Sequence, residues 1–259
     1  MIRFDCHVHV YEEVTATRGA RYVPAVPAPL AGWQAGMARH GLSGGVIVQV
    51  SFLGFDNSQL LDALSRLDPQ RFAGVAVVPD EIEAGALDAL VAAGIRGIRW
   101  NLVRGAPLPD LDSPAVAGLL QRLRERGLHL EIQLEGPRLP ALVGPLLSRG
   151  VTVVVDHFGL PDEADPARDP WLCALAQAGD LSGLFVKFSA PYRSPVDVAP
   201  HARALLELLP PDHVVWGTDW PHTQHEAITD YDRAAAGREA FGIGDDAAAV
   251  KALYGLSLA

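Results

Sequence analysis

Cysteine is scarce in this sequence, and its scarcity excludes one class of protein. Cys6 and Cys173 are the only cysteines among 259 residues. Two cysteines cannot make the disulfide framework that holds many small secreted domains together. We therefore expect both residues to be reduced thiols, which predicts a cytoplasmic location.

Positive charge and long apolar runs are scarce as well. The chain has 21 Lys and Arg residues against 31 Asp and Glu residues, which gives a formal net charge of −10. Nucleic-acid binding needs clustered basic side chains, so this balance argues against such a partner. No window approaches the roughly 18 consecutive apolar residues of a membrane-spanning helix, so we expect no membrane association. The composition leaves the oligomeric state open.

What the sequence does contain is a regular alternation of two kinds of segment. Short runs rich in β-branched residues alternate with longer runs rich in Ala and Leu, which is typical of βα units around a parallel sheet. Eight strands are predicted, at Arg3–Val10, Gly44–Val50, Phe72–Val78, Ile95–Leu102, Leu128–Leu134, Val151–His157, Leu184–Ser189 and His213–Asp219. Eight such units predict a single-domain (β/α)8 TIM barrel over residues 1–259. A doubly wound open sheet is the competing architecture, but no glycine-rich dinucleotide motif follows the first strand.

Helices are predicted between these strands. Ser113 followed by Pro114 predicts the start of one helix, and Gly127 predicts its end. Other helices are predicted after Asn57 and near Leu30–Arg39, Ala86–Ala93, Leu139–Ser148, Pro170–Ala178, Val198–Leu209, Ile228–Ala240 and Asp245–Leu253. The longest stretch without a predicted element is Glu12–Pro29. A loop after the first barrel strand lies over the active-site face, so we expect this segment to act as a lid.

The first predicted strand carries side chains that can do chemistry. Because side chains alternate along a strand, Asp5, His7 and His9 are expected on one face, and Cys6 on the other in the core. Two imidazoles at this spacing can converge on one metal ion or one substrate oxygen. Asp5 lies deeper and is expected to be a structural partner.

Two later strands end in similar residues. His157 ends the apolar sixth strand, and Asp219 ends the eighth. The carboxyl ends of barrel strands deliver catalytic groups to one common face. A carboxylate there can act as a general base toward water, either free or held by a metal. Gly217, two residues earlier, leaves room beneath Asp219.

Together these segments resemble the amidohydrolase superfamily. The resemblance is carried by Asp5-Cys6-His7-Val8-His9, Asp156-His157-Phe158-Gly159, Gly217-Thr218-Asp219-Trp220-Pro221-His222, Phe55-Asp56-Asn57-Ser58 and Arg96-Gly97-Ile98-Arg99-Trp100-Asn101. It points to the small lactonases of this superfamily, in particular the 2-pyrone-4,6-dicarboxylate lactonases of aromatic catabolism. It implies a (β/α)8 barrel that hydrolyses a small anionic lactone. Asp219 would activate water, while His7, His9 and His157 would polarise the scissile carbonyl, directly or through a metal.

The cofactor stays open at this point. His7, His9, His157 and Asp219 could together hold one divalent ion such as zinc. Many metal-dependent members of the superfamily have a histidine ligand at the end of the fifth strand, where this chain has Gln133, a poor ligand for zinc. The lactonases that the chain resembles work without metal. A metal-dependent and a metal-independent site are therefore both compatible with the sequence.

The resemblance also implies how the substrate is held. Arg99, Arg104 and Arg193 would bind substrate carboxylates, because the guanidinium fork matches a carboxylate. Further substrate contacts are expected from four residues near the strand ends: Gln133, Ser51, Asn57 and His222. The related lactonases have an arginine directly after His-Phe-Gly, where this chain has Leu160. This departure leaves the identity of the lactone open.

Other functions are compatible with the same residues. A metal-dependent decarboxylase of the superfamily would use a similar barrel, an amide or ester hydrolase would use similar groups, and a barrel could bind an acidic metabolite without catalysis. Among the remaining polar residues, Lys187 is expected to form a structural ion pair with Asp5 or Glu131. His129 and His201 are expected at the surface.

Overall fold

The computed structural model describes residues 1–258, in which eight parallel strands form one sheet in the order β1 to β8. The strands are β1 (Phe4–Val8), β2 (Gly44–Val48), β3 (Phe72–Ala76), β4 (Ile95–Asn101), β5 (His129–Gln133), β6 (Val153–Val155), β7 (Leu184–Ser189) and β8 (Val214–Gly217). The sheet closes where β1 meets β8. There the His9 N–H donates to the Trp220 carbonyl at 2.7 Å, and the Asp219 N–H donates to the His7 carbonyl at 2.8 Å. The predicted single-domain (β/α)8 barrel is confirmed, and the open doubly wound sheet is wrong.

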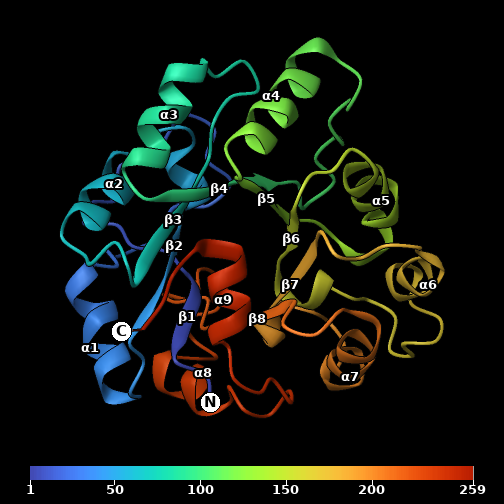
Figure 1. Cartoon of the computed structure of the whole chain (residues 1–259). Coiled ribbons are helices and arrows are strands. Elements are labelled where there is room, and N and C mark those ends of the chain that lie inside the picture. The colour runs from blue at the N-terminus through green and yellow to red at the C-terminus, as the bar shows by residue number, and fades with distance from the viewer. Residues whose placement is uncertain (259) are drawn as a thin grey trace.

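Helices surround this barrel. They are α1 (Leu30–Arg39), α2 (Ser58–Ser65), α3 (Ala84–Ala92), α4 (Pro114–Glu125), α5 (Pro140–Ser148), α6 (Pro170–Gln177), α7 (Ala199–Leu208), α8 (Tyr231–Ala236) and α9 (Ala247–Tyr254). Helices α1 to α8 ring the strands, whereas α9 lies across one end of the barrel, in front of β1 and β8 (Figure 1). Short 3-10 turns follow several strands: η1 (Ser51–Leu53), η2 (Gly136–Arg138), η3 (His157–Gly159) and η4 (Pro191–Arg193).

The helix ends follow local capping rules. Ser113 caps α4 as predicted, because its side chain accepts a hydrogen bond from the Val116 N–H. The helix predicted at Ile228–Ala240 is too long. The Asp230 side chain accepts a hydrogen bond from the Arg233 N–H and caps the helix, so α8 begins at Tyr231. It ends at Ala236, before the predicted end at Ala240.

Two apolar layers hold the barrel together. An outer layer joins the strands to the surrounding helices and includes Trp33, Ile47 and Ile98. An inner layer lies beneath α9 and includes Phe4 and Tyr254. Because strands covered on both faces must be apolar on both, they appear in the sequence as nearly continuous apolar runs. The inner layer closes the amino-terminal end of the barrel and leaves the carboxyl ends of the strands as the open mouth.

The first strand departs from the predicted alternation of side chains. Its register with β2 shifts between Asp5 and Val8, as at a β-bulge. Cys6 packs with Phe4 in the inner layer. His7 also points into the barrel, where its ring lies against the inward-facing side chains of Glu131 in β5 and Lys187 in β7. The expectation that Cys6 and His7 lie on opposite faces is therefore wrong.

The bulge also separates Asp5 from the histidines. The Asp5 carboxylate points outward, because it accepts hydrogen bonds from Trp33 Nε1 of α1 at 3.2 Å and from the Tyr231 hydroxyl of α8 at 3.1 Å. It also accepts hydrogen bonds from the Thr218 N–H and hydroxyl, each at 2.8 Å. The predicted common face is wrong, but Asp5 is a structural partner as expected. It ties β1 and β8 to two helices.

Most strands end earlier than predicted, including the two that lead to His157 and Asp219. β6 ends at Val155 and β8 at Gly217, so His157 and Asp219 lie just beyond the strands. The φ angle is +54° at His157 and +62° at Asp219. Non-glycine residues in this left-handed region are strained, and such strain is found mainly at functional sites. The chain turns at these residues, and each turn aims a side chain into the mouth.

Two histidines expected at the surface are buried. His129 and His201 are each only 1% exposed. The His129 ring lies against Gly97, where an added Cβ would come within 2.1 Å of its Nε2. For His129 the expectation failed because Gly97, the residue that makes room for its ring, lies on a different strand.

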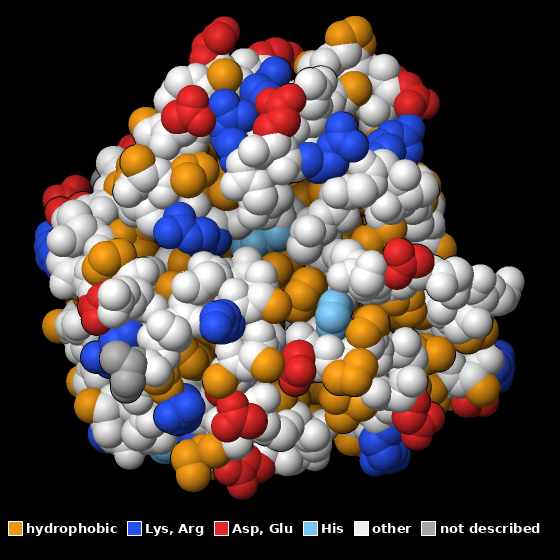
Figure 2. Space-filling view, in the orientation of Figure 1, with side chains coloured by type: hydrophobic (Ala, Val, Ile, Leu, Met, Phe, Trp, Pro, Cys, Tyr) orange, Lys and Arg blue, Asp and Glu red, His pale blue; other side chains and the backbone are white. Residues whose placement is uncertain are grey.

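Charged side chains are interspersed on the face that carries α9. Figure 2 shows acidic and basic groups mixed there, without a continuous basic area of the kind that phosphate binding needs. Within residues 1–258, none of the helices has both the length and the apolar character to cross a bilayer.

Candidate active site

A polar cavity opens at the carboxyl ends of the strands. Its lining includes His9, His157 and Asp219 from the ends of β1, β6 and β8. It also includes Arg21 and Tyr22 from the segment predicted to act as a lid, so that segment lies over the mouth as expected. The sequence segments that resemble known catalytic motifs therefore meet in one place.

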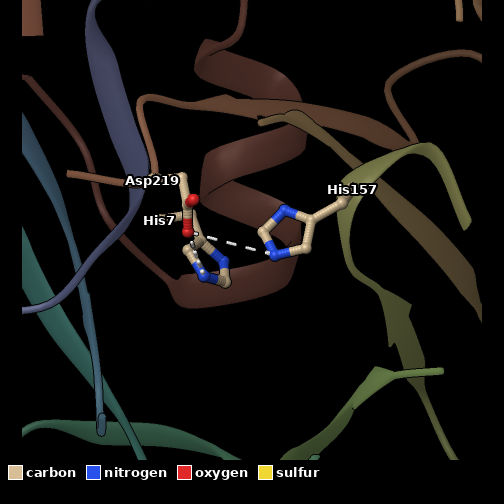
Figure 3. A group of neighbouring side chains, drawn as sticks. All are labelled: His7, His157 and Asp219. Carbon is tan, nitrogen blue, oxygen red and sulfur yellow. Dashed lines mark ion pairs between the residues drawn. The ribbon is translucent and has the colours of Figure 1, made fainter. Parts of the chain in front are cut away.

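Three imidazoles surround one carboxylate oxygen at the floor of this cavity. The Nε2 atoms of His7, His9 and His157 lie 3.7, 3.8 and 4.0 Å from Asp219 Oδ1. Figure 3 shows His7 and His157 pointing toward Asp219 from different strands. Gly217 is needed for this approach, because an added Cβ would lie 2.6 Å from the backbone nitrogen of His7.

Burial keeps these imidazoles neutral. It lowers the pKa of His9 and of His157 to about 4, and it lowers the pKa of His7 well below 6.5. His9 Nδ1 lies 2.8 Å from the Val48 carbonyl oxygen, which accepts only, so the proton of the neutral ring is on Nδ1 and the Nε2 lone pair faces the cavity. His157 Nδ1 is oriented by the Ser189 hydroxyl at 2.8 Å.

The other oxygen of Asp219 is tied to two residues of η4. Oδ2 accepts hydrogen bonds from Arg193 Nε at 2.8 Å and from the Tyr192 hydroxyl at 2.7 Å, and it forms an ion pair with Arg193 Nη2 at 2.7 Å. Although burial acts in the opposite direction, Arg193 and the three histidines hold the pKa of Asp219 well below its usual range. Oδ1 is buried and has no hydrogen-bond partner within residues 1–258.

A second layer of buried charges lies beneath His7. Arg99 donates to Asp156 Oδ2 from Nη2 at 2.8 Å and from Nε at 3.1 Å, and Lys187 donates to Glu131. Burial opposes ionisation of Asp156, but Arg99 and His7 hold its pKa well below its usual range. Burial and the Asp156 charge raise the pKa of Glu131 to about 7. The predicted pairing of Lys187 with Glu131 is confirmed.

The residues expected to bind substrate divide into two groups. Five of them line the cavity: Arg99, Arg104, Arg193, Gln133 and Ser51. Asn57 and His222 do not belong to this lining. The Asn57 side chain bonds the backbone of Val77, and His222 Nδ1 lies behind Asp219 at 3.0 Å from the Tyr192 hydroxyl.

Comparison with known proteins now gives the family. Residues 4–256 match the family model described as amidohydrolase. The chain belongs to the amidohydrolase family. It is 32% identical over 238 residues to a 2-pyrone-4,6-dicarboxylate hydrolase of Comamonas testosteroni, across 84% of this chain and 76% of the relative. It is 28% identical over 231 residues to a 4-sulfomuconolactone hydrolase of Rhizobium radiobacter, across 85% of this chain and 76% of the relative.

A solved structure gives the same result. A Pseudomonas putida protein described as a candidate 2-pyrone-4,6-dicarboxylic acid hydrolase superposes with a TM-score of 0.87 and 33% sequence identity. The match covers 99% of this amidohydrolase and 98% of the other chain. The predicted superfamily and the prediction that the protein is a hydrolase are both confirmed.

The donor set of this amidohydrolase fits a divalent metal ion. His7, His157 and Asp219 each offer a ligand atom within 4.8 Å of the others, and His7 Nε2 and Asp219 Oδ1 are buried without a hydrogen-bond partner. Histidine nitrogen and carboxylate oxygen are ligands that zinc uses in catalytic sites. His9 is not part of this compact group, although its Nε2 lies close to Asp219. The same set can also serve as hydrogen-bond partners without a metal.

Several residues of this site were missed by sequence reasoning. Tyr192 contacts Asp219 directly, and Arg21 and Gln224 line the cavity. The signal for Tyr192 was its place next to Arg193, just after a strand end. Arg21 and Gln224 lie in loops without a periodic pattern, so there was no geometric reason to choose them from the sequence.

Proposed function

We propose that this amidohydrolase opens a small carboxylated lactone, with Asp219 as the general base. The observation that carries the proposal is the group of three imidazole Nε2 atoms within 4.0 Å of Asp219 Oδ1, on the floor of an arginine-lined cavity. The names of the two relatives support it, since each denotes an enzyme that hydrolyses a lactone or pyrone with a further acidic group.

The reaction follows from the positions of these groups. Asp219 Oδ1 takes a proton from water while the water oxygen bonds to the lactone carbonyl carbon. The carbonyl oxygen gains negative charge, which an imidazole N–H donor beside Asp219 stabilises. When the tetrahedral intermediate collapses, the ring C–O bond breaks and the leaving oxygen takes the proton from Asp219. The products are a carboxylic acid, which ionises at neutral pH, and a hydroxyl or enol group.

Substrate binding prepares the base. In the free protein Arg193 holds the pKa of Asp219 low, which makes the carboxylate a weak base. A substrate carboxylate attracts the same guanidinium. As Arg193 turns toward the substrate, the pKa of Asp219 rises, so the base becomes stronger only when substrate is present. Arg104 and Arg21, which also line the cavity, hold the second acidic group.

A divalent metal would be held by His7, His157 and Asp219, with His9 beside them. When bound, it would act as a Lewis acid at the carbonyl oxygen and lower the pKa of a bound water. With or without a metal, the residues of the chain keep the same tasks. The arginines orient the substrate anion, and the buried cavity floor excludes bulk water from the lactone carbonyl.

Proton release measures the reaction directly. Metal-stripped and zinc-loaded protein are mixed in weak buffer with a panel of carboxylated lactones, and pH is followed. Proton release by stripped protein supports a metal-independent lactonase, and release only after loading supports a metal-dependent one. Initial proton uptake would indicate the decarboxylase. Thermal stabilisation by the lactones without turnover would indicate a barrel that only binds, and would refute the proposal.

A further inference from the structure

The ionic cluster beneath His7 has no role in the reaction described above. It consists of Arg99, Glu131, Asp156 and Lys187, each at most 3% exposed. Removing four charges from water is costly, and such a cluster contributes little to stability compared with an apolar core. Its placement against a catalytic ring suggests a task in positioning that ring.

The decisive contact is the one made by Lys187. Its Nζ donates to Glu131 Oε2 and lies 3.2 Å from His7 Nδ1. An ammonium group has donors only, so Nδ1 must accept in this hydrogen bond. In a neutral imidazole one nitrogen accepts and the other carries the proton, so the proton is on Nε2.

A competing partner lies nearby without making the bond. Asp156 Oδ1 is 3.3 Å from His7 Nδ1, yet it has no hydrogen-bond partner within residues 1–258. If Asp156 accepted a hydrogen bond from a protonated Nδ1, Nε2 would carry the lone pair and could bind a metal. Lys187 and Asp156 therefore favour opposite tautomers, and the observed contact is with Lys187.

We propose that Lys187, anchored by Glu131, is a positioning residue that holds His7 as the Nε2–H tautomer. His7 then presents a hydrogen-bond donor to the carbonyl oxygen, whereas His9, with its proton on Nδ1, presents a lone pair. In this form His7 has no lone pair on Nε2, so a metal held by His7, His157 and Asp219 would require the other tautomer of His7. The catalytic use of the donor rests on the proposed lactonase function, but the tautomer itself does not.

The tautomer is measured on the unmodified protein. Protein labelled with ¹⁵N in its histidines is studied by long-range ¹H–¹⁵N NMR at pH 7, where protonated and unprotonated ring nitrogens resonate far apart. The signal that disappears in His7→Gln assigns the ring. We expect a protonated Nε2 and an unprotonated Nδ1. A protonated Nδ1 overturns the inference, whether or not the protein proves to be a lactonase.

A variant tests the role of Lys187. In Lys187→Met/Glu131→Gln the ammonium and its anchor are both removed, and we expect the His7 proton to move to Nδ1, which then donates a hydrogen bond to Asp156 Oδ1. The NMR signals of His7 should then exchange positions. Zinc affinity, measured by calorimetry, should rise about 10- to 100-fold. With a lactone substrate, kcat should fall roughly 10²- to 10³-fold, the usual cost of one oxyanion donor, with KM nearly unchanged.

The chain offers a matched control. Lys251 in α9 is the other lysine of the sequence and is exposed, so Lys251→Met should leave the NMR signals, zinc affinity and kcat unchanged. An unchanged His7 tautomer in a folded double variant overturns the role of Lys187. If the double variant fails to fold, the tautomer measured in the unmodified protein still decides the inference.

Discussion

Replacing Asp219 with Asn removes the proposed base while keeping nearly the same shape. The amide oxygen can still accept from the Tyr192 hydroxyl, which lies 2.7 Å from Oδ2. The amide nitrogen cannot accept a proton from water, and the negative charge opposite Arg193 is lost. The variant therefore separates the chemistry of the carboxylate from its packing.

The magnitudes follow from these contacts. Loss of a general base costs about 10²- to 10⁴-fold in rate, or roughly 3–5 kcal/mol in the activation barrier. Stability falls less, because Arg193 is 13% exposed and keeps a contact with the Thr223 carbonyl at 3.3 Å. Losing its charged partner should cost about 1–3 kcal/mol in the free energy of unfolding. For a chain of this size that lowers Tm by roughly 2–10 °C.

The assay compares kcat by proton release with Tm by calorimetry. Asp169→Asn is the matched control, since Asp169 is also buried but caps α6, where its side chain accepts from the Leu172 N–H at 2.9 Å. Asn serves the same capping role, so the control should retain kcat. Folded Asp219→Asn protein with kcat within tenfold of the unmodified enzyme would refute the assignment of Asp219 as base.

Three further predictions rest on the same structure. The pKa values of His9 and His157 are lowered from 6.5 to about 4, so between these pH values the folded protein binds fewer protons than the unfolded chain. The free energy of unfolding should therefore fall by about 3 kcal/mol per histidine as pH drops from 6.5 to 4. Denaturant titrations at a series of pH values can check this. Gly217→Ala should lower the free energy of unfolding by about 1–3 kcal/mol, since its Cβ would lie 2.6 Å from a backbone nitrogen of β1, whereas Gly144→Ala in α5, with no atom within 4 Å, should not. Arg21→Ala should raise KM for dicarboxylated lactones more than for monocarboxylated ones, and an equal rise for both would show that Arg21 does not select the second acidic group.

Much of the barrel was predictable because its rules are local. Strands covered on both faces must be apolar, and each helix between them has a readable start or end, as Ser113 shows for α4. The placement of His157 and Asp219 at one mouth then follows from the parallel order of the strands. The resemblance to known lactonases supplied the roles of these residues, which spacing alone did not.

What could not be predicted depends on contacts between distant segments. The bulge in β1 turns His7 to the face opposite Asp5, and nothing in the sequence Phe4-Asp5-Cys6-His7 marks it. Lys187 meets His7 across 180 positions of the chain, so their contact exists only once the barrel is closed. The residue proposed to set the tautomer of His7 is thus one that sequence reasoning could identify only as part of a structural ion pair.

The charges around the cavity indicate what kind of molecule binds there. Arg99 is neutralised by Asp156, and Arg193 by Asp219. Arg21 and Arg104 also line the cavity but form no ion pair within residues 1–258; the Arg21 guanidinium donates to Asn101 Oδ1 at 2.9 Å and to the Val103 carbonyl at 2.7 Å. The mouth therefore carries two unneutralised positive charges in a protein of net charge −10, and a small dianion would balance them. One of these charges, Arg21, comes from the segment predicted to act as a lid, so that segment places a positive charge at the mouth that a substrate anion can meet.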